Sequence, residues 1–167
     1  MYEVGDYVIN SGNGICRIEE RMHLDMEGID ENQWFFLVVP VEEQATRLYI
    51  PVEKIADKTR MVMDEVEAWN LMDGVVQIDE LEIPNDRMRE QIYKQAVLSN
   101  DPTQLIRVIK TIFVRKQQRE AEGKKNTVID ERYFKLAENN LYDELAFAIG
   151  REKEEIPELI AERINRK

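Results

Sequence analysis

Two glycines near the start of the chain, Gly12 and Gly14, have a spacing that can cradle a phosphate group. A dinucleotide-binding loop needs a third glycine at the start of a helix, and a P-loop needs Gly-Lys-Ser/Thr. The residues after Gly14 are instead Ile-Cys-Arg-Ile-Glu-Glu, which alternate as a strand leaving a turn does. We therefore interpret these glycines, and Gly5 before them, as bend and turn residues.

Histidine and cysteine, the residue types that most often act in catalysis or bind metals, each occur only once in the chain. His23 is the only histidine, and no cysteine or second histidine lies near it to complete a metal site. Cys16 is the only cysteine, so it forms no internal disulfide, and its position within a strand indicates a small packed residue rather than a nucleophile. We predict that the chain is not an enzyme and that it binds no metal, cofactor or small-molecule substrate.

The chain also lacks the patterns of a membrane or secreted protein. Its longest apolar run, residues 34–41, is interrupted by Pro40 and is far shorter than the roughly 20 residues of a membrane span. The acidic residues Glu3 and Asp6 stand where a signal peptide has basic ones. We expect a cytoplasmic protein without membrane contact.

Charge is distributed unevenly along the chain. The net charge is −11, which argues against simple wrapping of nucleic acid. Residues 1–58 carry 5 basic and 12 acidic groups, whereas residues 83–167 carry 17 and 15. Within the latter part, residues 86–135 have 12 basic and 7 acidic groups, a local net charge of +5. This division favours two surfaces with different uses.

The first third of the chain has the pattern of short strands. Residues 2–9, 15–20, 33–41 and 47–52 are rich in Val, Ile, Tyr and Phe and are separated by polar or glycine-containing turns. Only closure or near closure hides the edges of so short a sheet. We predict a small antiparallel β-barrel domain over residues 1–58.

The period of the apolar residues becomes helical after Val52. Residues 64–72 are predicted to form a short helix that carries Val66 and Trp69 on one face and stops at Gly74. Further helices are predicted over residues 85–98, 103–120 and about 134–148, and from about residue 156. The first of these has Met88, Ile92 and Ala96 in register, Asp101 and Pro102 suit the start of the second, and Gly150 suits the end of the third.

Residues 59–167 are thus predicted to form an all-α bundle, which makes the whole chain α+β. The apolar residues that share helical faces define the expected core: Leu105, Ile109, Phe113, Phe134, Leu141 and Leu145.

The order of these motifs resembles one known family. It includes Val4-Gly5-Asp6-x-Val8, the turn at Gly14, Tyr49-Ile50-Pro51-Val52, Ser99-Asn100-Asp101 before a long helix, and Ala137-x-x-x-Leu141-x-x-Glu144-Leu145-Ala146. Over nearly its whole length the chain resembles the bacterial CarD-like transcription regulators.

The resemblance implies a Tudor-like N-terminal domain that binds the β subunit of RNA polymerase. The strand around Tyr49 is the candidate contact, with Arg47, Leu48 and Pro51 beside it. Edge pairing and an aromatic anchor could supply the binding energy. Leu24 and Tyr49 stand where some relatives have basic residues, and Tyr49 could equally pack only locally.

The resemblance also implies that the helical domain contacts promoter DNA near the upstream edge of the melted bubble and modulates the open complex. Asp86 stands where the family commonly has a tryptophan that wedges into the minor groove. Arg87, Arg89, Lys124 and Lys125 are the remaining candidates for phosphate contacts. We therefore expect weak DNA binding without sequence specificity.

Two functions remain open at this point. The chain is either a polymerase-bound regulator that touches DNA or an acidic protein-protein adaptor that has lost or altered DNA binding. The local charge of +5 favours the first, and Asp86 favours the second. The sequence does not distinguish activation from repression, name the promoters, or separate a monomer from a strand-exchanged dimer.

Overall fold

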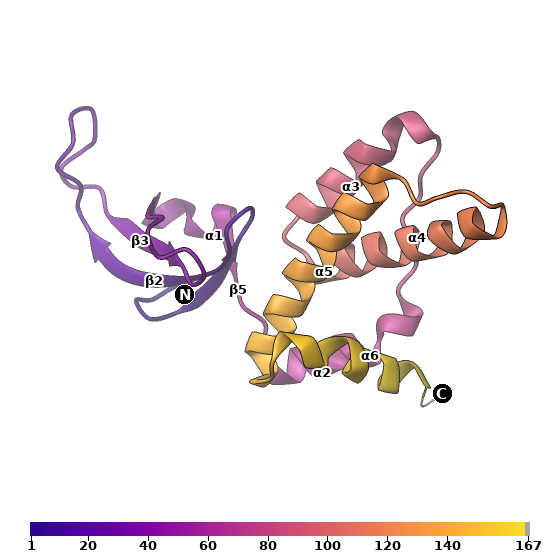
Figure 1. The fold of residues 1–167 in the computed structure, drawn as a ribbon. Coiled ribbons are helices and arrows are strands. Elements are labelled where there is room, and N and C mark those ends of the chain that lie inside the picture. The colour runs from indigo at the N-terminus through magenta and orange to yellow at the C-terminus, as the bar shows by residue number, and fades with distance from the viewer. Residues whose placement is uncertain (166–167) are drawn as a thin grey trace. The chain divides into compact units, whose positions relative to one another are not determined.

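A computed structural model describes residues 1–165 of the chain. The chain divides into two compact units, Met1–Val62 and Met63–Lys167. The first unit contains all the strands of the described part, and the second is built from helices (Figure 1). The predicted α+β class is confirmed. Within residues 1–165, no helix combines the length and the apolar composition that crossing a membrane requires.

The first unit is a curled antiparallel sheet of five strands. They are β1 (Tyr7–Asn10), β2 (Gly14–Met22), β3 (Phe35–Pro40), β4 (Leu48–Pro51) and β5 (Thr59–Met61). Their order is β4-β3-β2-β1-β5, so β4 and β5 are edges and the sheet is an open half-barrel rather than a closed one (Figure 1). The strand β5 was not predicted, because it is short and lies beyond the predicted domain end at residue 58.

Alternation along the strands places one set of side chains in a common core. Val8, Cys16, Ile18, Phe36, Val38 and Ile50 are all buried there. Ile55 closes this core from the short helix α1 (Ile55–Lys58), which follows the 3-10 turn η1 (Val52–Lys54). Burial raises the pKa of the Cys16 thiol to about 11, so the thiol is protonated at neutral pH, as the packing interpretation expects.

The turn between β1 and β2 explains the glycine pair. Gly12 and Gly14 have φ values of 88° and 68°, in the region that disfavours residues with a Cβ atom. The Asn13 amide donates to the Asn10 carbonyl oxygen over 3.0 Å and closes the turn. The turn interpretation is confirmed.

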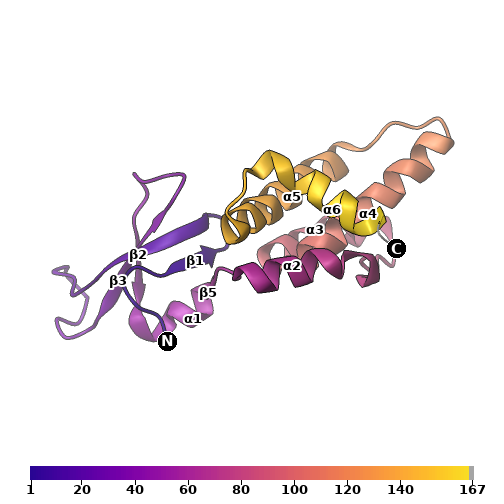
Figure 2. The same cartoon turned by 90° about the horizontal axis from the view of Figure 1, so that it is seen from below.

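The described part of the second unit, residues 63–165, contains five helices and three 3-10 turns. Its helices are α2 (Glu65–Asp73), α3 (Arg89–Leu98), α4 (Pro102–Ala121), α5 (Val128–Ile149) and α6 (Ile156–Asn165). Its turns are η2 (Val75–Gln77), η3 (Asp86–Met88) and η4 (Lys153–Glu155). Figure 2 shows α4 and α5 as the two longest helices, joined by one loop.

Local capping residues set the ends of these helices. Asp64 and Glu67 form a reciprocal capping box at the start of α2. Asp101 accepts a hydrogen bond from the Thr103 amide, and Pro102 occupies the first position of α4. Gly150 adopts a left-handed conformation, φ 68°, directly after α5. The predicted helices therefore begin and end close to the expected residues, except that α5 begins at Val128, well before the predicted start at about residue 134.

The predicted helix faces were less accurate than the helix ends. Leu105, Leu141 and Leu145 are buried in the core of the second unit, and Ile109 and Phe134 pack against it. Phe113, however, is 52% exposed, while Ile112 is 1% exposed. The error has a simple cause, since adjacent helix positions lie about 100° apart and only one of them faces the core.

Two other predicted apolar faces are only partly buried. In α2 the buried residues are Ala68 and Met72, whereas Val66 is exposed and Trp69 packs only partly against the core. At the start of α3, Met88 is exposed and Ile92 is half-buried, and fully buried Tyr93 takes the inner position.

Candidate interaction surfaces

The edge strand β4 offers an unpaired backbone. It pairs only with β3 in the part of the chain that the structure describes, with Tyr49 opposite Leu37 and Ile50 opposite Phe36. The Val52 amide donates to the Trp34 carbonyl oxygen over 3.0 Å, which fixes the phase of the ladder. In an antiparallel pair the hydrogen-bonding direction alternates, so the Tyr49 amide and carbonyl groups point away from β3.

The side chains of β4 have two environments. Ile50 is buried in the half-barrel core, whereas Tyr49 is 44% exposed on the opposite face. Arg47 is exposed just before the strand, and Leu48 and Pro51 are half-buried. An extended segment of a partner can therefore pair with the Tyr49 backbone and contact the tyrosine ring at once.

A second exposed aromatic group on the first unit was not predicted. The Trp34 ring, 40% exposed, lies 3.7 Å from the His23 ring between their centroids, and the Arg21 guanidinium carbon lies 4.5 Å from the Trp34 centroid. His23 Nδ1 also lies 3.0 Å from the Gln33 carbonyl oxygen. His23 is exposed, as expected, but it is tied to the end of the β2–β3 connection. The sequence carried no signal of this stacking.

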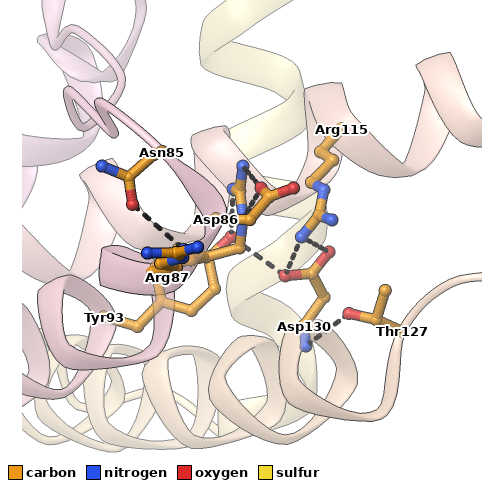
Figure 3. A network of polar contacts seen from close by, with 8 residues as sticks. Asn85, Asp86, Arg87, Tyr93, Arg115, Thr127 and Asp130 are labelled. Carbon is orange, nitrogen blue, oxygen red and sulfur yellow. Dashed lines mark hydrogen bonds and ion pairs between the residues drawn. The ribbon is translucent and has the colours of Figure 1, made fainter.

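The second unit holds a network of polar side chains around a buried carboxylate (Figure 3). Asp130, in the first turn of α5, is fully buried and accepts hydrogen bonds from Arg115 Nη1 at 3.0 and 3.1 Å. The Tyr93 hydroxyl donates to Asp130 Oδ1 over 2.9 Å. Thr127 accepts a hydrogen bond from the Asp130 amide and so caps α5. The network therefore joins α3, α4 and α5.

Arg89 links this network to the surface. Its Nη1 donates to the Tyr93 hydroxyl over 3.1 Å, while its Nε and Nη2 donate to Asp86 Oδ1 over 3.2 and 2.9 Å. The Arg89 side chain is only 18% exposed, whereas that of Asp86 is 80% exposed. The hydrogen bond and the charge of Arg89 hold the pKa of Asp86 below its usual value, and Arg115 and Arg119 add weaker attraction.

The predicted DNA-contacting residues therefore differ in availability. Arg87 is exposed and forms no ion pair with another described residue, but Arg89 is already engaged by Asp86. Lys124 pairs with Glu122 over 3.2 Å, and Lys125 is exposed.

Arg119 relates the loop of Lys124 and Lys125 to η3. Its Nε donates to the Lys125 carbonyl oxygen over 2.9 Å, and its charge acts on Asp86. The two predicted groups of cations therefore belong to one region of the second unit.

A groove of about 490 Å³ lies between α3 and α5. It is lined by Lys94, Val97, Leu98, Arg132, Tyr133, Lys135, Leu136 and Asn139. Arg132 is held by Glu90 over 2.7 Å, whereas Lys94 and Lys135 form no ion pair with another described residue. The groove is thus lined by aliphatic residues, Tyr133 and basic residues. The groove was not predicted, because its two walls are some 40 residues apart in the chain.

No group of three or more His, Cys, Asp or Glu side chains in residues 1–165 is arranged to hold a metal ion. The polar side chains that do converge are those of the Asp130 network, where arginine and tyrosine satisfy the carboxylate. These contacts fix Arg89 and Arg115 in place, and the most exposed side chain beside them is that of Asp86. The chemistry of this network suits the binding of anions more than group transfer.

Comparison with known protein families gives a match to the first unit. Residues 2–63 match the CarD-like/TRCF RID domain, a protein-interaction domain that contacts RNA polymerase. A comparison with curated protein sequences gave no significant match. The matched segment contains all five strands, including the free edge of β4 and the exposed Tyr49. The N-terminal unit of this chain therefore belongs to the CarD-like/TRCF RID domain family, the RNA polymerase-interacting domain of CarD-like proteins.

Proposed function

We propose that this protein is a transcription regulator that binds the β subunit of RNA polymerase through its N-terminal unit, a Tudor-like half-barrel. Its helical unit contacts promoter DNA and modulates the stability of the open complex. In this assignment the two units have separate partners, with the division after Val62. The uneven charge supports it, because the helical unit contains the basic segment of residues 86–135.

The observation that carries the polymerase assignment is the free edge of β4 in a domain of the RID family. Strand addition to this edge uses the outward amide and carbonyl groups of Tyr49, and the tyrosine ring supplies contact area at low entropic cost. Arg47 flanks this edge, and Leu48 and Pro51 add partly buried apolar area next to the ring. The strand β4 therefore contributes to the affinity for polymerase and also fixes the register in which a polymerase strand would pair with it.

The DNA contact rests on phosphate-binding cations. Arg87, Lys124 and Lys125 are exposed and can reach a DNA backbone, whereas Asp86 cannot insert between bases as an apolar side chain does. Each neutralised phosphate contributes a slope of about −0.9 to the dependence of log K on log salt. Binding is accordingly weak and dependent on salt, and polymerase supplies the local concentration that the free protein lacks.

A second candidate function is favoured by one specific contact. Asp86 already neutralises Arg89, so the helical unit offers fewer free cations than its sequence indicates. The chain would then be an acidic adaptor on polymerase with little or no DNA binding. Both functions share the contact made by the N-terminal unit.

Replacing Tyr49 with alanine in the full chain is expected to weaken polymerase binding about 30-fold, the effect of an anchor residue worth about 2 kcal/mol. The fold should persist, because the Tyr49 side chain is 44% exposed and Ile50 carries the core packing of the strand. The dissociation constant for immobilised polymerase measures the effect.

Met61→Ala is the matched control. Met61 is 45% exposed and lies on β5, the other edge of the same sheet. Its replacement should leave the dissociation constant nearly unchanged. A larger loss of polymerase affinity for Met61→Ala than for Tyr49→Ala would place the contact at the β5 edge and contradict the assignment to β4.

A further inference from the structure

The Asp86 carboxylate forms an exposed ion pair with the Arg89 guanidinium group on the helical unit. Both of its hydrogen bonds come from one guanidinium group, that of Arg89, and both end on Oδ1. The short turn η3 that carries Asp86 follows Pro84 and Asn85, and the Asp86 side chain is 80% exposed. The carboxylate can therefore leave the guanidinium group without disturbing a packed core.

The guanidinium groups around this carboxylate are fixed from the protein side. Arg89 is held by the Tyr93 hydroxyl at 3.1 Å, and Arg115 is held by both oxygens of the buried Asp130. Their side chains are only 18% and 20% exposed. Arginines that are already ordered lose little conformational entropy when they bind a ligand.

Positive charge exceeds negative charge at this place. Three arginines, Arg89, Arg115 and Arg119, act on the Asp86 carboxylate. Asp130 offsets only one of these charges and is itself fully buried. Figure 3 shows the Asp86 carboxyl group and the Arg115 guanidinium group in the same part of the network. Without Asp86, Arg89 would have no ion-pair partner among the described residues.

We propose that Arg89, with Arg115 and Arg119 behind it, forms a binding site for a phosphodiester group of nucleic acid, and that Asp86 occupies this site as a competing anion. Guanidinium groups bind carboxylate and phosphate oxygens with the same fork of N–H donors, so the two anions exclude each other on Arg89. Asp86 thereby lowers the DNA affinity of the free protein. This inference rests on the proposed DNA contact of the helical unit and names one of its sites.

The test is the affinity of the full chain for a short DNA duplex, with Asp86→Asn as the main variant. Removing the competing anion is expected to raise the affinity about fivefold, the largest effect typical of an exposed ion pair. The salt slope should also become steeper by about 0.9, because one more phosphate is neutralised. An affinity and a salt slope equal to those of the unmodified chain would overturn the proposal.

Glu131→Gln is the matched control, because it removes the same charge from an exposed residue that is not in an ion pair with any described cation. It should leave the salt slope unchanged and raise the affinity less. The double variant with Asp86→Asn and Arg89→Ala should not show the increase in DNA affinity that is expected for Asp86→Asn alone. An equal gain with Glu131→Gln, or a gain that survives Arg89→Ala, would show a general charge effect and overturn the site.

Two further measurements are needed. The first distinguishes DNA from free phosphate as the ligand, and the second distinguishes failure of this site from failure of the proposed DNA contact. Inorganic phosphate should not displace the duplex from the Asp86→Asn protein at concentrations that leave ionic strength constant, and efficient displacement would reassign the site to free phosphate. Arg87→Ala should lower the DNA affinity of the otherwise unmodified chain. If it does so while Asp86→Asn has no effect, the DNA contact stands and only the competition by Asp86 is wrong.

Discussion

Replacing Ile112 with alanine is expected to lower the free energy of unfolding of the helical unit by about 4 kcal/mol. Ile112 is 1% exposed and lies in the core that α4 shares with its neighbours. The variant loses the transfer free energy of the removed methylene and methyl groups and also leaves a cavity. Denaturant unfolding followed by far-ultraviolet circular dichroism measures the change.

Phe113→Ala is the control for this prediction, since the next residue along α4 is larger but 52% exposed. Its replacement should change the free energy of unfolding by no more than about 0.5 kcal/mol, as is usual at surface positions. Equal losses for the two variants would mean that the assigned face of α4 is wrong.

Replacing Asp130 with alanine is expected to cost about 3 kcal/mol of stability. The substitution leaves the Tyr93 hydroxyl without its acceptor and leaves Arg115, which is only 20% exposed, without its counterion. Removing one member of a buried ion pair is destabilising by roughly 3 to 5 kcal/mol, and the lower end applies because Arg115 reaches solvent. Thermal and denaturant unfolding of the full chain measure the loss.

Tyr93→Phe provides the comparison within the same network. It removes the hydrogen bond to Asp130 and the acceptor of Arg89 Nη1, but it leaves the two hydrogen bonds from Arg115, so it should cost only about 1 to 2 kcal/mol. The double variant should lose less than the sum of the two single losses, because both substitutions break the same hydrogen bond. A smaller effect for Asp130→Ala than for Tyr93→Phe would contradict the central place of Asp130.

Local signals in the sequence were enough to place the helices of the second unit. Asp101 with Pro102 marks the start of α4, and Gly150 marks the end of α5, because capping depends on neighbouring residues alone. Which residue of an apolar pair faces the core depends on the other helices. For that reason Phe113 was wrongly predicted to lie in the core, whereas Ile112 is the buried residue of the pair.

Contacts between distant residues explain what the sequence could not reveal about the candidate sites. Tyr93 and Asp130 are 37 positions apart, and no local pattern joins them. The cap formed by Thr127 and the Asp130 amide is local, but it does not indicate that the carboxylate turns inward to two other helices. The pairing of Asp86 with Arg89 does have a local signal, since the two residues are three apart.

The sheet shows a similar division. The alternation of apolar and polar residues in β1 to β4 was visible in the sequence. The strand β5 has only three residues, and it is a strand because it pairs with β1. A fragment ending at residue 58 would remove β5 and leave the β1 edge unpaired. Fragments that test the N-terminal unit should therefore end after Val62.

The most direct test of the proposed function is polymerase capture by two fragments, residues 1–62 and residues 63–167. Circular dichroism first verifies that each fragment is folded. We predict that the first fragment captures RNA polymerase with nearly the affinity of the full chain, that Tyr49→Ala weakens this capture, and that the second fragment alone captures little. Capture by residues 63–167 equal to that by the full chain, with none by folded residues 1–62, would contradict the account.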